Sequence, residues 1–418
     1  MQLFANLRNR YRFVRPVWRY LFALIDAVGA WLCRVCNAAG RPAPKLPQPS
    51  DVRRLLLVQL DHLGDAVIST TLLPAIRKRF SQAQIDVLAA PWNCEVFAVR
   101  RDVGRIQVSV WNRFARDARR FFWPFSTLYW GWTLRRRQYD LAIDVRGDFS
   151  VALMLFAAGV RYRVGWKCAG GGFLLHDAPD YVPGRPEVES RRQLLLRVGV
   201  ESGEAARSVP RWEPSLESER FVRRMMGDFA RDDRPLYVFH LGAGTTAKTW
   251  PMEHWRELLG RVIVELDGRV VLVGGRGDSA AARDVTEGLY WPNVMDWTGR
   301  LTLDQLAAVC RRAALYIGAD SGPAHLAAAV GTRSIVLFSG TNDAAQWKPH
   351  GEHVTVLRRE VACAPCYAVS CPLAGHPCLR ELTPAAVMDT IEALFPTVLA
   401  ITSPHWTAEV KHGRRSPG

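Results

Sequence analysis

The sequence predicts an α/β protein with two doubly wound, parallel-sheet domains. Two series of short apolar stretches indicate this, each stretch bounded by turn residues and separated from the next by a segment of helical periodicity. With 418 residues, 49% hydrophobic and 23% charged, the chain is long enough for two full cores and has a globular composition. We expect Rossmann-like domains over residues 51–215 and 230–398, facing each other across a ligand-binding cleft.

The first domain opens with a buried strand at Leu55–Leu60 and a tight loop. A helix is expected from Asp65 to Phe80, because its apolar residues recur every three or four positions. Its further strands are expected at Ile85–Ala89, Ile106–Val110 and Tyr139–Val145. In the second domain, strands are expected at Leu236–Leu241, Val270–Val273, Leu315–Ile317 and Ile335–Phe338.

The loop in "GADSGPAHLAAAVG" precedes a helix with clear ends. Ser321 or Gly322 is a suitable N-cap, and Gly331 suits the left-handed residue that ends a helix. Asp320 therefore lies at the carboxyl edge of the sheet, beside a helix N-terminus that attracts anions, with His325 one turn further on. The structural alternative is that the acid and the serine only cap the helix.

The loop in "HLGAGTTAKTW" has the composition of a phosphate-binding loop. Glycines at Gly242 and Gly244 allow backbone N–H groups to approach a phosphate, and Thr245, Thr246 and Lys248 add hydroxyls and a positive charge.

Two familiar nucleotide-binding motifs are nevertheless incomplete. The loop departs from a Walker motif because Ala247 replaces the required glycine, and Pro251 favours a later helix start, which argues against an NTPase. A third carboxyl-edge loop, Gly274–Asp278, contributes Asp278 but does not complete the G-x-G-x-x-G pattern of dinucleotide oxidoreductases.

The net charge of +15 is concentrated in residues 1–54 and 100–137, which are also rich in aromatic residues. Arginines with Trp, Tyr and Phe favour an anionic membrane surface or an anionic amphiphile. No nucleic-acid-binding motif is present, so we expect no nucleic-acid partner. The alternative for the second segment is a surface helix that packs its aromatic residues inward.

The N-terminal 39 residues form a basic, amphipathic extension without a membrane span, because charged residues interrupt each apolar run. A helix is expected here, with Trp18, Phe22, Ile25, Gly29 and Leu32 on the face that lies on a membrane; packing against a domain is the alternative. Residues 40–50, with four prolines, are expected to be a linker, and residues 399–418 a tail.

In order, "LDHLGD", "HLGAGTTAKTWP", "VGGRGD", "GADSGPAHLAAAVG" and "LFSGTNDAAQWKP" resemble the motifs of the glycosyltransferase family 9 heptosyltransferases. The resemblance implies a GT-B fold and an inverting, metal-independent transfer of heptose from ADP-heptose to the lipopolysaccharide core, with no cofactor. It also implies a cytoplasmic enzyme, peripheral on the inner face of the bacterial inner membrane. The basic N-terminal extension departs from typical members of the family.

The resemblance also implies roles for single residues. Asp65 matches the general base, with a helix N-cap as its structural alternative, and Lys248 matches a group that stabilises the leaving diphosphate. The donor-binding residues are expected to be Gly242, Gly244, Thr245, Thr246, Lys248, Asp278, Asp320, Ser321, Gly322 and His325. The anionic, lipid-linked saccharide acceptor of lipid A–Kdo type is expected to contact His62, Arg146 and Arg163, for which ordinary surface charge is the alternative.

Four of the nine cysteines, Cys363, Cys366, Cys371 and Cys378, have a spacing suited to a structural metal or to disulfides, with free thiols as the favoured alternative. Two other functions stay open: a family 9-type transferase that uses another nucleotide sugar, and a non-catalytic protein that binds sugar nucleotides or lipid.

Overall fold

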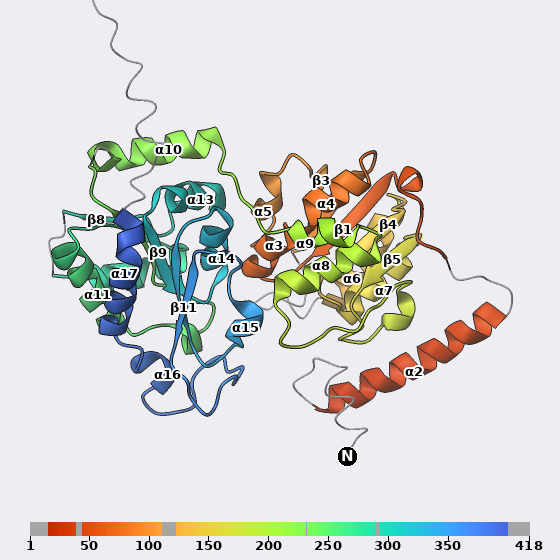
Figure 1. Cartoon of the computed structure of the whole chain (residues 1–418). Coiled ribbons are helices and arrows are strands. Elements are labelled where there is room, and N and C mark those ends of the chain that lie inside the picture. The colour runs from red at the N-terminus through yellow and green to blue at the C-terminus, as the bar shows by residue number, and fades with distance from the viewer. Residues whose placement is uncertain (1–15, 39–43, 111–122, 231, 289–291, 400–418) are drawn as a thin grey trace, which may run out of the picture. The chain divides into compact units, whose positions relative to one another are not determined.

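The protein divides into two compact units, Met1–Arg211 and Trp212–Gly418, which are described separately. A computed structural model describes residues 16–38, 44–110, 123–230, 232–288 and 292–399 (Figure 1). Residues 1–15, part of the expected linker at 39–43, residues 111–122 of the second basic segment and the expected tail at 400–418 lie outside the described residues.

The first unit contains a five-stranded parallel sheet in the order β3-β2-β1-β4-β5. Its strands are β1 Arg54–Gln59, β2 Gln84–Ala89, β3 Arg105–Val108, β4 Leu141–Asp144 and β5 Tyr162–Gly165. The four expected strands are confirmed with small shifts at their ends. The fifth, β5, was not expected because it is only four residues long and Arg163 interrupts its apolar character.

Helices cover both faces of this sheet. They are α3 Leu63–Ser69, α4 Leu72–Arg79, α5 Glu95–Ala98, α6 Trp123–Arg135, α7 Phe149–Ala157, α8 Glu187–Arg197 and α9 Ser202–Arg207, with short 3-10 turns η1 Pro49–Asp51 and η3 Gly172–Leu174. The buried face of β1 packs with residues of α6 and α7, among them Leu134, Val151 and Leu155. This double cover explains why β1 has an almost unbroken apolar sequence.

The prediction of a single helix from Asp65 to Phe80 is wrong. The structure contains two helices, because Thr70 and Thr71 donate their side-chain hydroxyls to the carbonyls of Val67 and Ile68. Such local side-chain bonds compete with the helical ladder and favour a break at that point.

The N-terminal extension contains the expected helix, α2 Pro16–Ala38, but the expected membrane face is wrong in part. Phe22 lies 5.2 Å from the ring of Phe149 on α7, and a Cβ at Gly29 would lie 2.5 Å from Phe173. These two residues therefore pack against the first unit, whereas Trp18 and Leu32 are exposed. Among the described residues, no helix is both long and apolar enough to cross a bilayer.

The second unit contains a six-stranded parallel sheet in the order β11-β10-β9-β6-β7-β8. Its strands are β6 Leu236–His240, β7 Arg269–Val273, β8 Val294–Asp296, β9 Leu315–Ala319, β10 Ser334–Phe338 and β11 Val354–Arg358. The four expected strands are confirmed, and the outer strands β8 and β11 are additional. Both are only partly buried, so their sequences lack a continuous apolar run.

The helices of the second unit are α10 Leu216–Met226, α11 Met252–Glu265, α12 Ser279–Thr286, α13 Leu303–Arg312, α14 Gly322–Ala329, α15 Ala344–Trp347, α16 Pro377–Arg380 and α17 Pro384–Leu399, with 3-10 turns η4 Gly227–Ala230, η5 Thr246–Lys248 and η6 Arg276–Asp278. Trp250 and Trp255 anchor its core, with ring centroids 4.9 Å apart. The indole N–H of Trp250 donates to the carbonyl of Leu382 at 2.8 Å. This contact fixes the chain between η5 and α11, directly behind the expected phosphate-binding loop.

We expect Trp250→Ala to lower the free energy of unfolding by about 3–5 kcal/mol, because it leaves a cavity and an unpaired carbonyl. The measurement is chemical unfolding of the full chain. Val264→Ala is the control, since Val264 is 76% exposed on α11; it should change the free energy by less than about 0.5 kcal/mol. Equal effects of the two substitutions would contradict the anchoring role of Trp250.

Candidate active site

Each sheet has one point at which the order of its strands reverses. In the first unit this point lies between β1 and β4, and in the second between β6 and β9. The loops after these strands therefore diverge to opposite faces and leave room at the carboxyl edge, where ligands of doubly wound sheets bind. The expected catalytic, donor-binding and acceptor-binding residues lie on the loops or helices that follow these four strands, except Asp278, which follows β7, and Arg163, which lies on β5.

In the first unit, an ion pair connects the two loops at this point. Arg146, after β4, donates to the carboxylate of Asp61, after β1, at 2.6 Å. Asp61 is fully buried, and its other oxygen accepts from the backbone N–H of His62 at 3.0 Å. Arg146 therefore lies at the predicted site, where its first role is to hold Asp61.

Asp65 lies in the first turn of α3 and is 6% exposed. The N-cap of this helix is His62, so the alternative that Asp65 is the N-cap is wrong. Among the described residues, none donates a hydrogen bond to the carboxylate oxygen Oδ1 of Asp65, and the guanidinium of Arg191 lies 3.6 Å from it. A buried carboxylate with an unoccupied acceptor is available to take a proton from a bound hydroxyl.

Burial raises the pKa of Asp65 to about 8, with a further contribution from the negative charge of Asp61. Burial also tends to raise the pKa of Asp61, but the positive charges around it, Arg146 first, together with the hydrogen bond from the His62 N–H hold that pKa below its usual value. The two neighbouring carboxyl groups are thus separated into one that stays ionised and one that titrates near neutral pH.

A buried cluster around α8 supports Asp65, and it was not predicted from the sequence. Arg191 is 2% exposed and donates to Glu187 at 3.1 Å and to the hydroxyl of Ser69 at 3.1 Å. Glu187 in turn accepts from the hydroxyl of Tyr181. The available signal was a Glu and an Arg four residues apart on the same helical face as the buried leucines Leu194 and Leu195.

The two other expected acceptor residues have different surroundings. His62 is exposed at the start of α3, next to Asp61. Arg163, on β5, donates to the carbonyls of Leu174 at 2.6 Å and Val160 at 2.7 Å. These bonds give Arg163 a structural role in the chain around β5, so its contact with an acceptor stays a prediction.

In the second unit, another ion pair joins the two loops at the reversal point. The ammonium group of Lys248, after β6, lies 2.6 Å from the carboxylate of Asp320, after β9. The same oxygen of Asp320 accepts from the amide of Asn342 at 2.7 Å. Asn342 was not singled out in the sequence, although it lies within the "LFSGTNDAAQWKP" motif. Asp320 thus holds the loop and orients the lysine.

Asp278 and Gly242 lie against each other below this loop. A Cβ at Gly242 would lie 2.1 Å from the Asp278 carboxylate, so only glycine allows this approach. Asp278 accepts from the backbone N–H of Gly275 at 2.8 Å and lies 3.8 Å from the imidazole of His240. His240 is also 3.3 Å from the hydroxyl of Ser321. Asp278 therefore stabilises the backbone around Gly242 and Gly275.

The helix expected after the 320–322 loop is confirmed as α14, with Ser321 as the N-cap residue and Gly322 at its first position. The hydroxyl of Ser321 donates to the carbonyl of Ala319 at 3.1 Å, and its oxygen accepts no hydrogen bond from the N–H groups of α14. His325 is 6% exposed, and burial lowers its pKa to about 4, so its imidazole is neutral near pH 7. A neutral His325 can donate one hydrogen bond to a ligand but carries no positive charge.

The loop hydroxyls differ in availability. Thr246 donates to the carbonyl of Val369 at 3.2 Å and is thereby engaged within the unit. The hydroxyl of Thr245 is buried and has no hydrogen-bond partner among the described residues. Thr245 is therefore the better candidate for a phosphate ligand, and Gly244 lies next to it in the chain.

The four late cysteines are free thiols: Cys363 and Cys366 are exposed, Cys371 is partly buried and Cys378 is buried. Burial raises the pKa of Cys378, as do the neighbouring thiols. Among the described residues, no three His, Cys, Asp or Glu side chains are placed to hold a metal ion. The described residues thus do not assemble these four thiols into a metal site, which was the less favoured of the alternatives.

The pKa of Asp65 predicts a pH dependence of stability. In the unfolded chain the pKa of an aspartate is about 3.9, and in the folded protein it is about 8. The contribution to stability is therefore complete below pH 4 and is lost as the pH rises through 8. We expect Asp65→Asn to lack this loss when thermal unfolding is followed from pH 5 to 9.

Asp180→Asn serves as the matched control for Asp65→Asn, because the side chain of Asp180 is 73% exposed. Its melting temperature should follow the wild-type curve over the whole range. If the curves of Asp65→Asn and the wild type were parallel, the pKa of Asp65 would not be raised.

The ion pair between Lys248 and Asp320 is expected to contribute to the free energy of unfolding. Lys248→Met leaves the buried carboxylate with Asn342 as its remaining side-chain partner, so the free energy of unfolding should fall by about 1–3 kcal/mol. Adding Asp320→Asn should restore part of the loss, because the buried charge is removed. A double-mutant cycle measures this coupling, and strictly additive losses would show that the pair is not coupled.

Two Rossmann-like units with charged residues gathered at their strand-order reversals define a GT-B type protein. Residues 130–376 match the family model of glycosyltransferase family 9 (heptosyltransferase). The chain therefore belongs to glycosyltransferase family 9, and it is a glycosyltransferase.

Similar proteins agree with this assignment. The chain is 26% identical to lipopolysaccharide heptosyltransferase 2 of Salmonella typhimurium, over 82% of this chain and 98% of that protein. It is 26% identical to lipopolysaccharide heptosyltransferase 3 of Escherichia coli, over 68% of this chain and 83% of that protein. The solved structure of the E. coli ADP-heptose lipopolysaccharide heptosyltransferase II has a TM-score of 0.66 at 22% identity, covering 82% of this chain and 99% of that one, so the fold is shared.

Proposed function

We propose that this glycosyltransferase moves a heptose from ADP-heptose to a lipopolysaccharide core acceptor of the lipid A–Kdo type, with inversion and without a metal ion. One observation carries the proposal: Asp65 is a buried carboxylate whose pKa is raised to about 8, at the strand-order reversal of a family 9 chain. The names of the relatives support the choice of heptose and of lipopolysaccharide.

Asp65 acts as the general base in the proposed reaction. An inverting transfer needs one carboxylate that accepts the proton of the acceptor hydroxyl while its oxygen attacks the anomeric carbon. A pKa near the working pH is best for this step, because the ionised form is then populated and still strongly basic. Burial and the charge of Asp61 raise this pKa, while Arg146 and Arg191 limit the rise.

Lys248 stabilises the diphosphate as it leaves. Its charge, the free hydroxyl of Thr245 and the N-terminus of α14 at Gly322 are the groups of the second unit that suit a phosphate. Asp320 holds Lys248, and the amide of Asn342 donates to the same carboxylate. Lys248 can therefore turn toward a phosphate while Asp320 keeps a hydrogen bond.

The acceptor is placed at the first unit, near Asp65. His62 is exposed there, and Arg146 is one-third exposed at its side chain while bound to Asp61, so both can meet an anionic saccharide. A lipid-linked acceptor also implies that the enzyme works on the inner face of the inner membrane. Transfer requires this acceptor hydroxyl to reach the donor held by the second unit.

A second candidate is a family 9 transferase that uses another nucleotide sugar, since none of the residues above selects the base or the sugar ring. A thermal-shift panel of ADP-, GDP- and UDP-sugars separates the two, because a ligand of the folded state raises the melting temperature. Selective stabilisation by ADP-heptose supports the first candidate, whereas a preference for a UDP- or GDP-sugar would replace it by the second.

Two substitutions test the assigned roles. Asp65→Asn should retain the ADP-heptose thermal shift and lower kcat by about 100-fold or more, the usual contribution of a general base. Lys248→Ala should reduce both the thermal shift and kcat, because it removes a phosphate ligand. Asp180→Asn is the matched control and should behave as the wild type.

Turnover is measured as ADP release in the presence of heptose-free lipopolysaccharide. Near-normal turnover of Asp65→Asn would remove Asp65 from the role of base. An unchanged donor shift and rate in Lys248→Ala would contradict its role toward the diphosphate.

A further inference from the structure

The outer side of α2 is an apolar surface that the first unit leaves exposed. Leu24 is 63% exposed, Trp31 58% and Val17 64%. The exposed large apolar residues of this helix are Val17, Trp18, Tyr20, Leu21, Leu24, Val28, Trp31, Leu32 and Val35, which we call the α2 stripe. At 100° per residue, most of them fall on one side of the helix, next to the packed face.

The opposite side of α2 is fixed to the first unit. The buried carboxylate of Asp26 accepts from the backbone N–H of Gly171 at 2.7 Å, and the thiol of Cys33 donates to the carbonyl of Phe173 at 3.6 Å. Together with the contacts of Phe22 and Gly29, these bonds hold one face of the helix and leave the α2 stripe on the surface. The helix that carries the α2 stripe is therefore fixed to the first unit by its other face.

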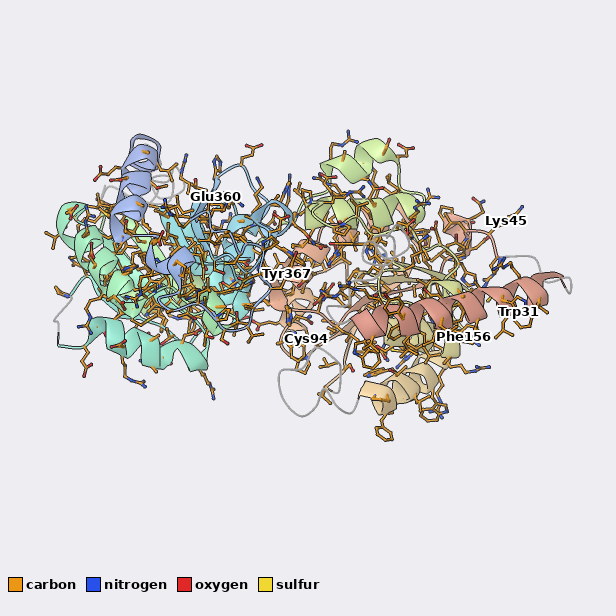
Figure 2. All side chains as sticks on the ribbon, turned by 90° about the horizontal axis from the view of Figure 1, so that it is seen from below. Trp31, Lys45, Cys94, Phe156, Glu360 and Tyr367 are labelled. Atoms are coloured by element: carbon orange, nitrogen blue, oxygen red, sulfur yellow. The ribbon has the colours of Figure 1, made fainter. Side chains whose placement is uncertain are left out.

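A second apolar patch lies on α6 and α7. Its exposed residues are Phe125, Leu128, Tyr129 and Trp132 of α6 and Phe156 of α7, which we call the α6 patch. Both helices connect strands of the same sheet and pack on each other, and α7 contacts α2 through Phe149. Seen from below, the labelled Phe156 lies between α2 and the side chains of α6 (Figure 2).

The charges around these two surfaces are positive. Arg19 and Arg34 lie on α2, Arg135 ends α6, and the guanidinium of Arg136 lies 3.8 Å from the ring centroid of Trp132. The sequences of α2, α6 and α7 contain one acidic residue, Asp26, and it is buried against Gly171. The exposed parts of the three helices thus combine apolar, aromatic and cationic side chains without a negative charge.

We propose that the α2 stripe and the α6 patch dock this enzyme onto an anionic phospholipid bilayer, with α2 lying in the plane of the interface. Trp and Tyr side chains are favoured at the level of the headgroups, and arginines attract anionic lipids. Because α2 is not apolar enough to span a bilayer, docking in the plane is the arrangement that buries the stripe. A second copy is a poorer partner, since it would bring two cationic helices together.

This docking deepens the proposed function, because it brings a lipid-linked acceptor and the enzyme to the same surface. Only this link to the acceptor rests on the proposed function. The binding itself depends on residues outside the candidate active site, so binding and turnover can fail independently.

Sedimentation with vesicles tests the proposal on the full chain. The wild type should bind vesicles of phosphatidylethanolamine and phosphatidylglycerol, and bind vesicles of phosphatidylcholine alone at least about tenfold more weakly. Leu24→Ser/Trp31→Ser and Leu128→Ser/Trp132→Ser should each weaken binding to the anionic vesicles by about tenfold or more, since each pair removes large apolar side chains from the interface. Leu216→Ser/Val264→Ser is the matched control, because both residues are at least 70% exposed on the second unit, and its binding should be unchanged.

Two further measurements separate the outcomes. All variants should keep the melting temperature of the wild type, which shows that they are folded. Unchanged vesicle binding by either stripe or patch pair would overturn the proposal, as would a dimer in gel filtration that dissociates in the Leu24→Ser/Trp31→Ser variant while vesicle binding persists. If wild-type vesicle binding is intact but no ADP-heptose turnover occurs, the docking stands and the proposed reaction fails.

Discussion

The reversal of strand order in each parallel sheet is the constraint on which the site of this protein depends. Strands that diverge from a central pair send their following loops to opposite faces, and the two loops can then meet only at the carboxyl edge. An ion pair connects the two loops in each unit: Asp61 with Arg146 in the first unit, and Lys248 with Asp320 in the second. Because one partner of each pair is almost fully buried, removing the other would leave a charge without compensation, which makes both loops difficult to rearrange.

Asp65 shows how the same packing provides chemistry. Its carboxyl group is buried next to an acid that Arg146 keeps ionised, and it has a cation nearby without a direct hydrogen bond. Nearby cations therefore offset only part of the free-energy cost of a buried negative charge on Asp65. As a result, the carboxyl group keeps its proton until the pH is near neutral. This arrangement depends on α8, which brings Arg191 and Glu187 beneath α3 from more than one hundred residues away in the chain.

Much of this could be predicted from the chain alone. Seven of the eight expected strands, all but β3, are buried along nearly their whole length and lie where their apolar runs indicated, because a strand covered on both faces must be apolar throughout. The edge strands β5, β8 and β11 were not predicted, because Arg163 interrupts β5 and because β8 and β11 are only partly buried. The loops with Lys248 and Asp320 were found because glycine, proline and charged residues directly follow apolar strands.

Local periodicity and the order of short motifs were enough to predict most strands of both sheets, the family and the residues at the loop ends. Which side chains contact each other could be read only from the folded chain. Folding placed Arg191 beside Asp65, Asn342 on Asp320 and Arg163 on backbone carbonyls, and it divided α2 into a packed face and an exposed stripe. Contacts between residues distant in the chain have no local periodicity, so burial, pKa and the choice between a packed and an exposed apolar face arise only when the chain is folded.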